Sequence, residues 1–91
     1  MSKETFNSVW DALEDDPIRA DNLRLRSELM QRIQQLIVER ELTQGQAAEL
    51  LQTTQPRISA LNNGKINEFR LDMLVDFIHR TGLHVTLKIA A

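Results

Sequence analysis

Residues 43–65 constrain the fold more than any other part of the chain, because they encode two short helices joined by a tight turn. Thr43 and Gln46 have the spacing of a capping box, in which the hydroxyl accepts a first-turn amide and the glutamine reaches back to the cap amide. The apolar positions in 47–51 follow a helical period. The pattern breaks at residues 52–54. A helix is therefore predicted to begin at about Thr43 and to end before that break.

A second short helix is predicted from Gln55 or Pro56, because first-turn amides have no intrahelical acceptor and proline is tolerated there. Either Thr54 or Gln55 can cap it, and proline disfavours helical geometry at the residue before it, so the boundary is defined to within one residue. Asn63 and Gly64 supply a left-handed stop. Two apolar residues are expected to face inward: Ile58 and Leu61. The other faces carry Gln55, Pro56, Arg57, Ser59 and Ala60.

This pair of helices resembles the helix-turn-helix of the lambda-repressor-like, or Xre, family. In that family a glutamine opens the first helix, a small residue lies four positions later, and an Ile-Ser pair lies inside the recognition helix. The matching residues are Gln44, Ala48, Ile58, Ser59 and Asn63-Gly64-Lys65. Residues 23–40 look like the family's first helix and 69–82 like its closing helix. The resemblance implies an all-α, lambda-repressor-like DNA-binding domain of about five helices.

The chain departs from the family pattern at two positions. The turn position that relatives usually give to glycine is Gln52, which would incur about 1 kcal/mol of strain in the left-handed conformation. Arg70 stands before the closing helix, where relatives often have serine, and an arginine cannot cap that helix. Each departure can alter how the domain meets DNA, but neither threatens the fold.

The resemblance also assigns roles to single residues. The positions that reach base edges in relatives correspond to Thr54, Gln55, Pro56, Arg57, Ser59 and Ala60. Gln55 can pair with adenine and Arg57 with guanine or a phosphate, whereas Pro56 and Ala60 offer only apolar contact. Phosphate contacts are expected from Thr43, Gln44, Gly45, Asn63, Lys65 and Arg70. In relatives the residue that matches Gln44 also braces the glutamine of the recognition helix.

The formal net charge of −2 conceals a division along the chain. Residues 1–21 hold two basic and six acidic side chains, a net charge of −4, so the remainder carries +2. Phosphate affinity depends on local cations, and three of them surround the motif: Arg57, Lys65 and Arg70. Because three cations form a thin patch, we expect useful DNA binding to require two copies.

The carboxyl-terminal segment is predicted to be a strand that joins two copies. Strict alternation puts Leu83, Val85, Leu87 and Ile89 on one face. No second strand-like run occurs in the chain, and an unpaired strand leaves its amides and carbonyls without partners. The same strand of a second copy, paired antiparallel across a two-fold axis, is the favoured partner. The edge of a toxin's sheet is the alternative. This tail makes the layout similar to a subgroup that includes HigA-type antitoxins.

The amino-terminal segment carries a short amphipathic pattern. Its aromatic and apolar stripe consists of Phe6, Val9, Trp10 and Leu13. Either this stripe packs on its own domain or on the dimer mate, or it forms an acidic arm that binds the basic surface of a toxin. Asp16 and Pro17 then read as a cap and first turn that open a long helix running to about Arg40. That helix has an apolar stripe and an opposite face of mixed charges, which we interpret as solvated. Three arginines of this face could alternatively contact phosphates: Arg24, Arg26 and Arg32.

These features predict three regions: an amphipathic acidic segment at 1–16, a helix-turn-helix domain at 17–82, and a dimerisation strand at 83–91. We expect a cytoplasmic protein, because the chain has no secretion leader, no membrane-length apolar run and no cysteine. The two histidines, His79 and His84, do not have a metal or catalytic spacing, so neither an enzyme nor a cofactor or metal is expected.

The function expected from the sequence is repression of the protein's own operon, as a homodimeric antitoxin on a palindromic operator in double-stranded DNA. Two alternatives remain: a toxin-neutralising interaction module with little DNA binding, and a stand-alone repressor without a toxin.

Overall fold

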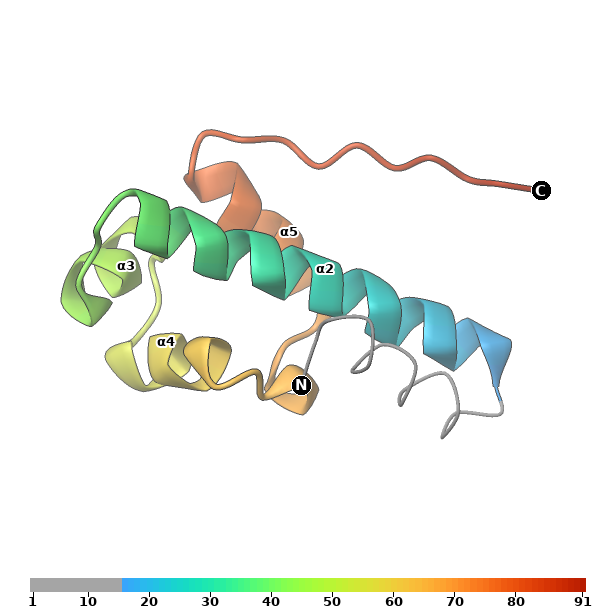
Figure 1. Cartoon of the computed structure of the whole chain (residues 1–91), viewed down its shortest axis with the longest axis horizontal. Helices are drawn as coiled ribbons and strands as arrows, with labels where there is room; N and C mark the ends of the chain where they lie inside the picture. The colour runs from blue at the N-terminus through green and yellow to red at the C-terminus, as the bar shows by residue number, and fades with distance from the viewer. Residues whose placement is uncertain (1–15) are drawn as a thin grey trace.

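The computed structural model describes residues 16–91 and consists of helices and their connections over that range. The helices are α2 (Pro17–Glu39), α3 (Gln44–Leu51), α4 (Gln55–Asn62) and α5 (Leu71–Arg80), with a short 3-10 helix, η1 (Ile66–Glu68), between α4 and α5 (Figure 1). The predicted all-α helix-turn-helix architecture is confirmed. The stripe predicted in the amino-terminal segment lies outside the described residues.

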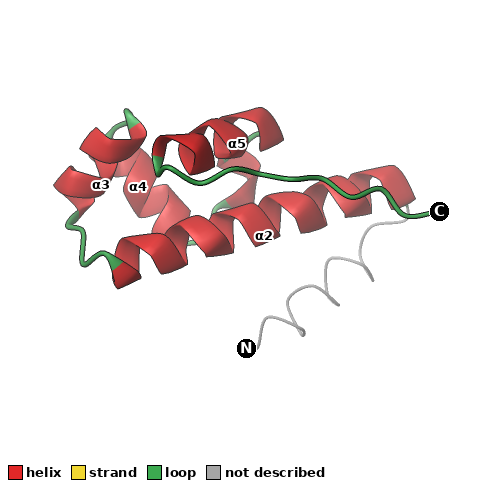
Figure 2. Cartoon of the chain, turned by 90° about the horizontal axis from the view of Figure 1, so that it is seen from above, coloured by secondary structure: helices red, strands yellow, loops and turns green. Residues whose placement is uncertain are grey.

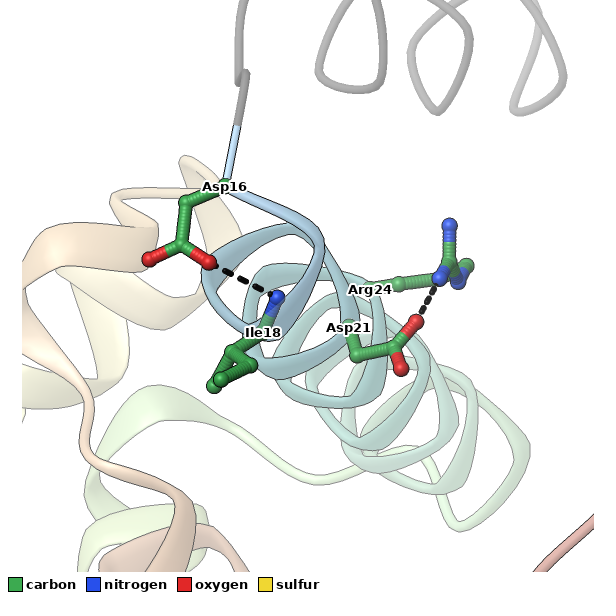
Figure 3. Close-up of polar contacts among 4 residues, drawn as sticks. All are labelled: Asp16, Ile18, Asp21 and Arg24. Carbon is green, nitrogen blue, oxygen red and sulfur yellow. Dashed lines mark hydrogen bonds and ion pairs between the residues drawn. The ribbon is translucent and has the colours of Figure 1, made fainter.

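Helix α2 begins as the sequence predicts. Asp16 is its N-cap, and the Asp16 carboxylate accepts a hydrogen bond from the Ile18 amide at 3.0 Å (Figure 3). Pro17 occupies the first helical turn, and an ion pair between Asp21 and Arg24 follows on the exposed surface. Because cap and proline act within one turn, this boundary is determined by local sequence.

The core forms where α5 and the α3–α4 pair pack on the long helix α2 (Figure 2). Its largest fully buried side chains are Phe69, Ile33, Leu51, Ile58, Leu61 and Leu74. They come from four helices and from the loop before α5, so every helix of residues 16–91 contributes to one core. This shared burial fixes the orientation of α4 relative to α2.

The segment after Gly82 runs back along α2 towards its amino-terminal end, without regular secondary structure in residues 83–91 (Figures 1 and 2). Gly82 ends α5 with a φ of 91°. Leu83 is half-buried, but the exposed fraction then rises from 38% at Val85 to 70% at Leu87 and 87% at Ile89. The predicted strand is therefore not formed in the single chain, because a strand requires a hydrogen-bonding partner.

None of the helices in residues 16–91 is both long enough and apolar enough to cross a membrane.

Candidate DNA-binding site

Helix α3 starts with the predicted capping box. The Thr43 hydroxyl accepts a hydrogen bond from the Gln46 amide at 3.1 Å, and the Gln46 side chain accepts one from the Thr43 amide at 2.9 Å. Ala47, Ala48 and Leu51 are buried, so one face of α3 packs inward while Thr43, with Gln44 at the first helical position, stays exposed. The amino end of α3 is thus presented to solvent with its amides partly unsatisfied.

The turn between α3 and α4 passes through Gln52 in the left-handed conformation, with φ 55° and ψ 49°. The strain expected at this position is therefore present in the backbone. Its amide still donates a hydrogen bond to the Glu49 carbonyl at 3.2 Å. The motif keeps the geometry that glycine would favour without having the glycine.

Replacing Gln52 with glycine is expected to raise the free energy of unfolding by about 0.5 to 1 kcal/mol, because relief of left-handed strain exceeds the added freedom of the unfolded chain. Urea unfolding followed by circular dichroism measures this change. Gln52→Ala is the matched control and should show no gain, since alanine keeps the strain. A glycine variant less stable than the wild-type protein would contradict the explanation.

Helix α4 presents its first turn outward. Thr54 caps it by accepting a hydrogen bond from the Arg57 amide at 3.2 Å. Gln55 and Pro56 are exposed and Ser59 is half-buried, whereas the apolar pair predicted to face inward, Ile58 and Leu61, has no exposed surface. The buried pair holds α4 against the core, so the first turn is displayed in a fixed direction.

The sequence predicted that Ala60 is exposed and can contact a base. The predicted exposure is wrong. Only 6% of Ala60 is exposed, and it belongs to the core cluster. The Lys65 amide donates a hydrogen bond to the Ala60 carbonyl at 3.1 Å, which closes the end of α4. Helical periodicity alone does not predict that Ala60 is buried.

Gly45 and Gln55 bring the starts of α3 and α4 together. A Cβ atom at Gly45 would lie 3.4 Å from the Gln55 side-chain nitrogen, at the lower limit of ordinary contact. The Gln55 side chain therefore lies across the first turn of α3. Because an added Cβ would be in ordinary contact with the glutamine, the space at this position does not itself require glycine, which is unfavourable within a helix.

The loop from α4 to α5 carries the other predicted phosphate contacts. Asn63 is the C-cap of α4, and Gly64 follows with a φ of 69°, which confirms the predicted left-handed stop. Lys65 and Arg70 are exposed, and Arg70 makes no side-chain cap, as predicted. These cations lie on either side of η1 and are joined to α4 by the same short loop.

Arg57 is oriented towards this loop. Its Nη1 donates a hydrogen bond to the Glu68 carbonyl at 2.9 Å, and its Cζ lies 5.7 Å from the centre of the Phe69 ring. The side chain is half-buried. The structure thus places Arg57 beside the other first-turn residues but with its guanidinium in contact with protein.

The sequence did not indicate a set of long polar side chains on α2 and α5 that hydrogen-bond to the backbone of α3, α4 and the following loop. From α2, Arg26 donates to the Ile66 and Phe69 carbonyls at 3.4 and 3.2 Å, and Gln34 donates to the Leu61 carbonyl at 2.6 Å. From α5, Arg80 donates to the Leu51 carbonyl at 3.0 Å. These bonds reach carbonyls at or next to the ends of α3, α4 and η1, and two of these carbonyls, those of Leu61 and Ile66, also accept a backbone amide.

Arg26 was predicted to lie on a solvated face of the helix. In the structure its side chain instead contacts the backbone around η1 and so supports the fold. Burial is the main cause that lowers the pKa of Arg26, and the charge of Arg19 lowers it further. No local sequence signal marks this residue, because the carbonyls it reaches lie 40 and 43 positions away.

Among residues 16–91, no three His, Cys, Asp or Glu side chains gather where a metal ion could bind. The site is instead a polar and basic surface on a helix, a helix end and a loop, which suits an anionic polymer better than a small substrate.

Comparison with known families agrees with this geometry. Residues 12–90 match the helix-turn-helix domain family, and the chain belongs to that family. No curated protein shows a significant match to the chain. Membership of a helix-turn-helix family supports DNA binding.

Proposed function

We propose that the protein is a sequence-specific transcriptional repressor that binds DNA as a homodimer, and that it acts in the cytoplasm as the antitoxin of its own operon. The observation that carries the DNA-binding part is the exposed first turn of α4. This turn is capped by Thr54 and held in place by the buried Ile58 and Leu61. A short helix displayed in this way can enter a major groove with its first residues against base edges.

The proposed base contacts are Thr54, Gln55, Pro56 and Ser59, which keep exposed surface in the structure. Gln55 is the strongest candidate, because its amide can pair bidentately with adenine. Its side-chain nitrogen lies close to Gly45, in the first turn of α3.

Replacing Gln55 with alanine is expected to weaken binding to the cognate operator by about 1 to 3 kcal/mol and to relax discrimination at one base pair. Fluorescence anisotropy with a promoter fragment and its single base-pair variants measures both effects. Val38→Ala, an exposed change on α2 outside residues 43–65, is the control and should leave binding unchanged. Unaltered operator affinity in Gln55→Ala would remove this residue from the base contacts.

The proposed phosphate contacts are Thr43, Gln44, Gly45, Asn63, Lys65 and Arg70. The amino end of α3 favours an anion through its amides and its dipole, while Lys65 and Arg70 add charge. Binding that weakens steeply with salt, together with preference for one operator sequence, supports a DNA regulator. Binding that is insensitive to both would favour the pure interaction module.

The proposed homodimer pairs residues 83–91 of two chains in a two-stranded antiparallel sheet. This supplies partners for backbone groups that one chain leaves unpaired and covers the exposed Leu87 and Ile89. A two-fold axis also matches a palindromic operator, whose half-sites should lie roughly 34 Å apart on one face of the duplex. Pairing with the edge of a toxin's sheet is the competing arrangement.

The proposed antitoxin role rests on the likeness of the sequence to the antitoxin subgroup described above. A stripe at Phe6, Val9, Trp10 and Leu13 is the candidate partner-binding arm. Pulling down the product of the neighbouring gene and footprinting the complex on its own promoter tests this role. A bound basic partner would support an antitoxin, whereas a footprint without any partner would favour a stand-alone repressor.

A further inference from the structure

Arg57 has contacts that an exposed base-reading side chain would not have. Its Nη1 is 2.9 Å from the Glu68 carbonyl oxygen, and its guanidinium lies over the ring of Phe69, which is itself only 1% exposed. A bidentate contact to guanine uses two N–H groups of the guanidinium fork at once. One N–H of Nη1 is engaged by a carbonyl and the group lies against the ring, so contacts with the protein set the direction in which the guanidinium points.

The loop that Arg57 contacts is also held by Arg26, from α2. Arg26 donates to the carbonyls of Ile66 and Phe69, and Arg57 donates to the carbonyl between them, that of Glu68. Three carbonyls around η1 thus accept hydrogen bonds from two guanidinium groups, one on α2 and one on α4. Charge-assisted hydrogen bonds of this kind are stronger than those between neutral groups.

We infer that Arg57 is a positioning residue, which locks residues 65–70 to the recognition helix so that Lys65 and Arg70 meet the phosphate backbone at a fixed distance from Gln55. This inference rests on the proposed function. It replaces the role in base readout that the family resemblance suggested for Arg57. The linkage is direct: Arg57 lies two residues after Gln55 on α4, and the loop it holds carries both exposed cations.

The test compares Arg57→Ala with Arg57→Lys. Both are measured for operator affinity, for discrimination among single base-pair variants, and for the salt dependence of binding. We expect Arg57→Ala to bind every sequence about tenfold more weakly with base preferences unchanged, and the slope of log affinity against log salt to fall by about 1 to 2 as two phosphate contacts loosen. Arg57→Lys should recover most of the affinity, because an ammonium can still donate to the Glu68 carbonyl and lie against the ring.

Two further measurements separate positioning from direct contact. In the free protein, amide hydrogen exchange at Glu68 and Phe69 should accelerate in Arg57→Ala, because their amides close the turn of η1. Lys65→Ala should weaken binding less in the Arg57→Ala background than in the wild-type background. Relaxed discrimination at one base pair, with exchange in 65–70 unchanged, would overturn the inference and restore Arg57 as a base reader.

The experiment also distinguishes failure of the inference from failure of the proposed function. If the wild-type protein does not prefer an operator over random DNA, the proposed function fails. The exchange rates of the free protein still decide whether Arg57 locks the loop, since that measurement needs no DNA. Unchanged exchange in Arg57→Ala would refute the lock in either case.

Discussion

Ending the chain after Gly82 is expected to give monomers and to weaken operator binding about 100-fold or more. The removed segment carries the exposed side chains of Leu87 and Ile89, 70% and 87% accessible in the single chain, and a run of backbone that pairs only with another strand. Two linked half-sites bind far more tightly than one, because the second contact becomes intramolecular. Analytical ultracentrifugation and anisotropy with a palindromic promoter fragment measure the two effects.

Two point variants provide the matched comparison for this truncation. Leu87→Asp puts a charge on the apolar face and should disrupt the dimer, whereas Lys88→Asp changes the opposite face and should leave it intact. Both residues are exposed in the single chain, so neither change should unfold the domain. A dimer that survives the cut after Gly82 would rule out pairing through this segment and would direct attention to the helices.

Replacing Phe69 with alanine is expected to lower the free energy of unfolding by about 3 to 5 kcal/mol. Phe69 is among the largest fully buried side chains, at 1% exposure, and it lies where the loop before α5 meets the core. Domains of this size are stabilised by only about 5 to 15 kcal/mol, so the variant should be close to unfolding at physiological temperature. Urea unfolding at 25 °C followed by circular dichroism gives the value.

Val38→Ala serves as the control for this loss. Val38 is an apolar residue of the long helix α2, but 75% of it is exposed, so its truncation should change stability by less than about 0.5 kcal/mol. A Phe69→Ala variant as stable as Val38→Ala would mean that the loop before α5 can repack without the aromatic ring. That result would also argue against a role of the Phe69 ring in supporting the Arg57 side chain.

Helix boundaries were the part of this fold that local sequence predicted best. Asp16, Thr43 and Thr54 were recognised as candidate caps from their neighbours, and all three accept the capping bond in the structure. The family resemblance marked Gln52 as the position that relatives give to glycine, and Gln52 takes the left-handed conformation in the structure. Such features depend on atoms within four residues along the chain, so their geometry is nearly independent of the rest of the molecule.

The candidate site was predictable only in part. The sequence correctly indicated that Gln55 and Pro56 are exposed and that Ile58 and Leu61 are buried, because helical period determines those faces. It placed Ala60 on the surface, whereas the tertiary structure buries Ala60 in the core. It assigned Arg57 a contact to guanine or a phosphate and did not indicate the hydrogen bond to the Glu68 carbonyl, 11 residues away.

By itself, the sequence determined approximately where α2, α3 and α4 start and stop and that one face of each of α3 and α4 is apolar, because capping and periodicity act over one or two turns. Only the tertiary structure decided that Arg26 and Arg57 hold the loop at 65–70 and that residues 83–91 run back along α2 unpaired. Those outcomes depend on groups up to 43 positions apart. Their proximity exists only after the shared core has fixed the helices against one another.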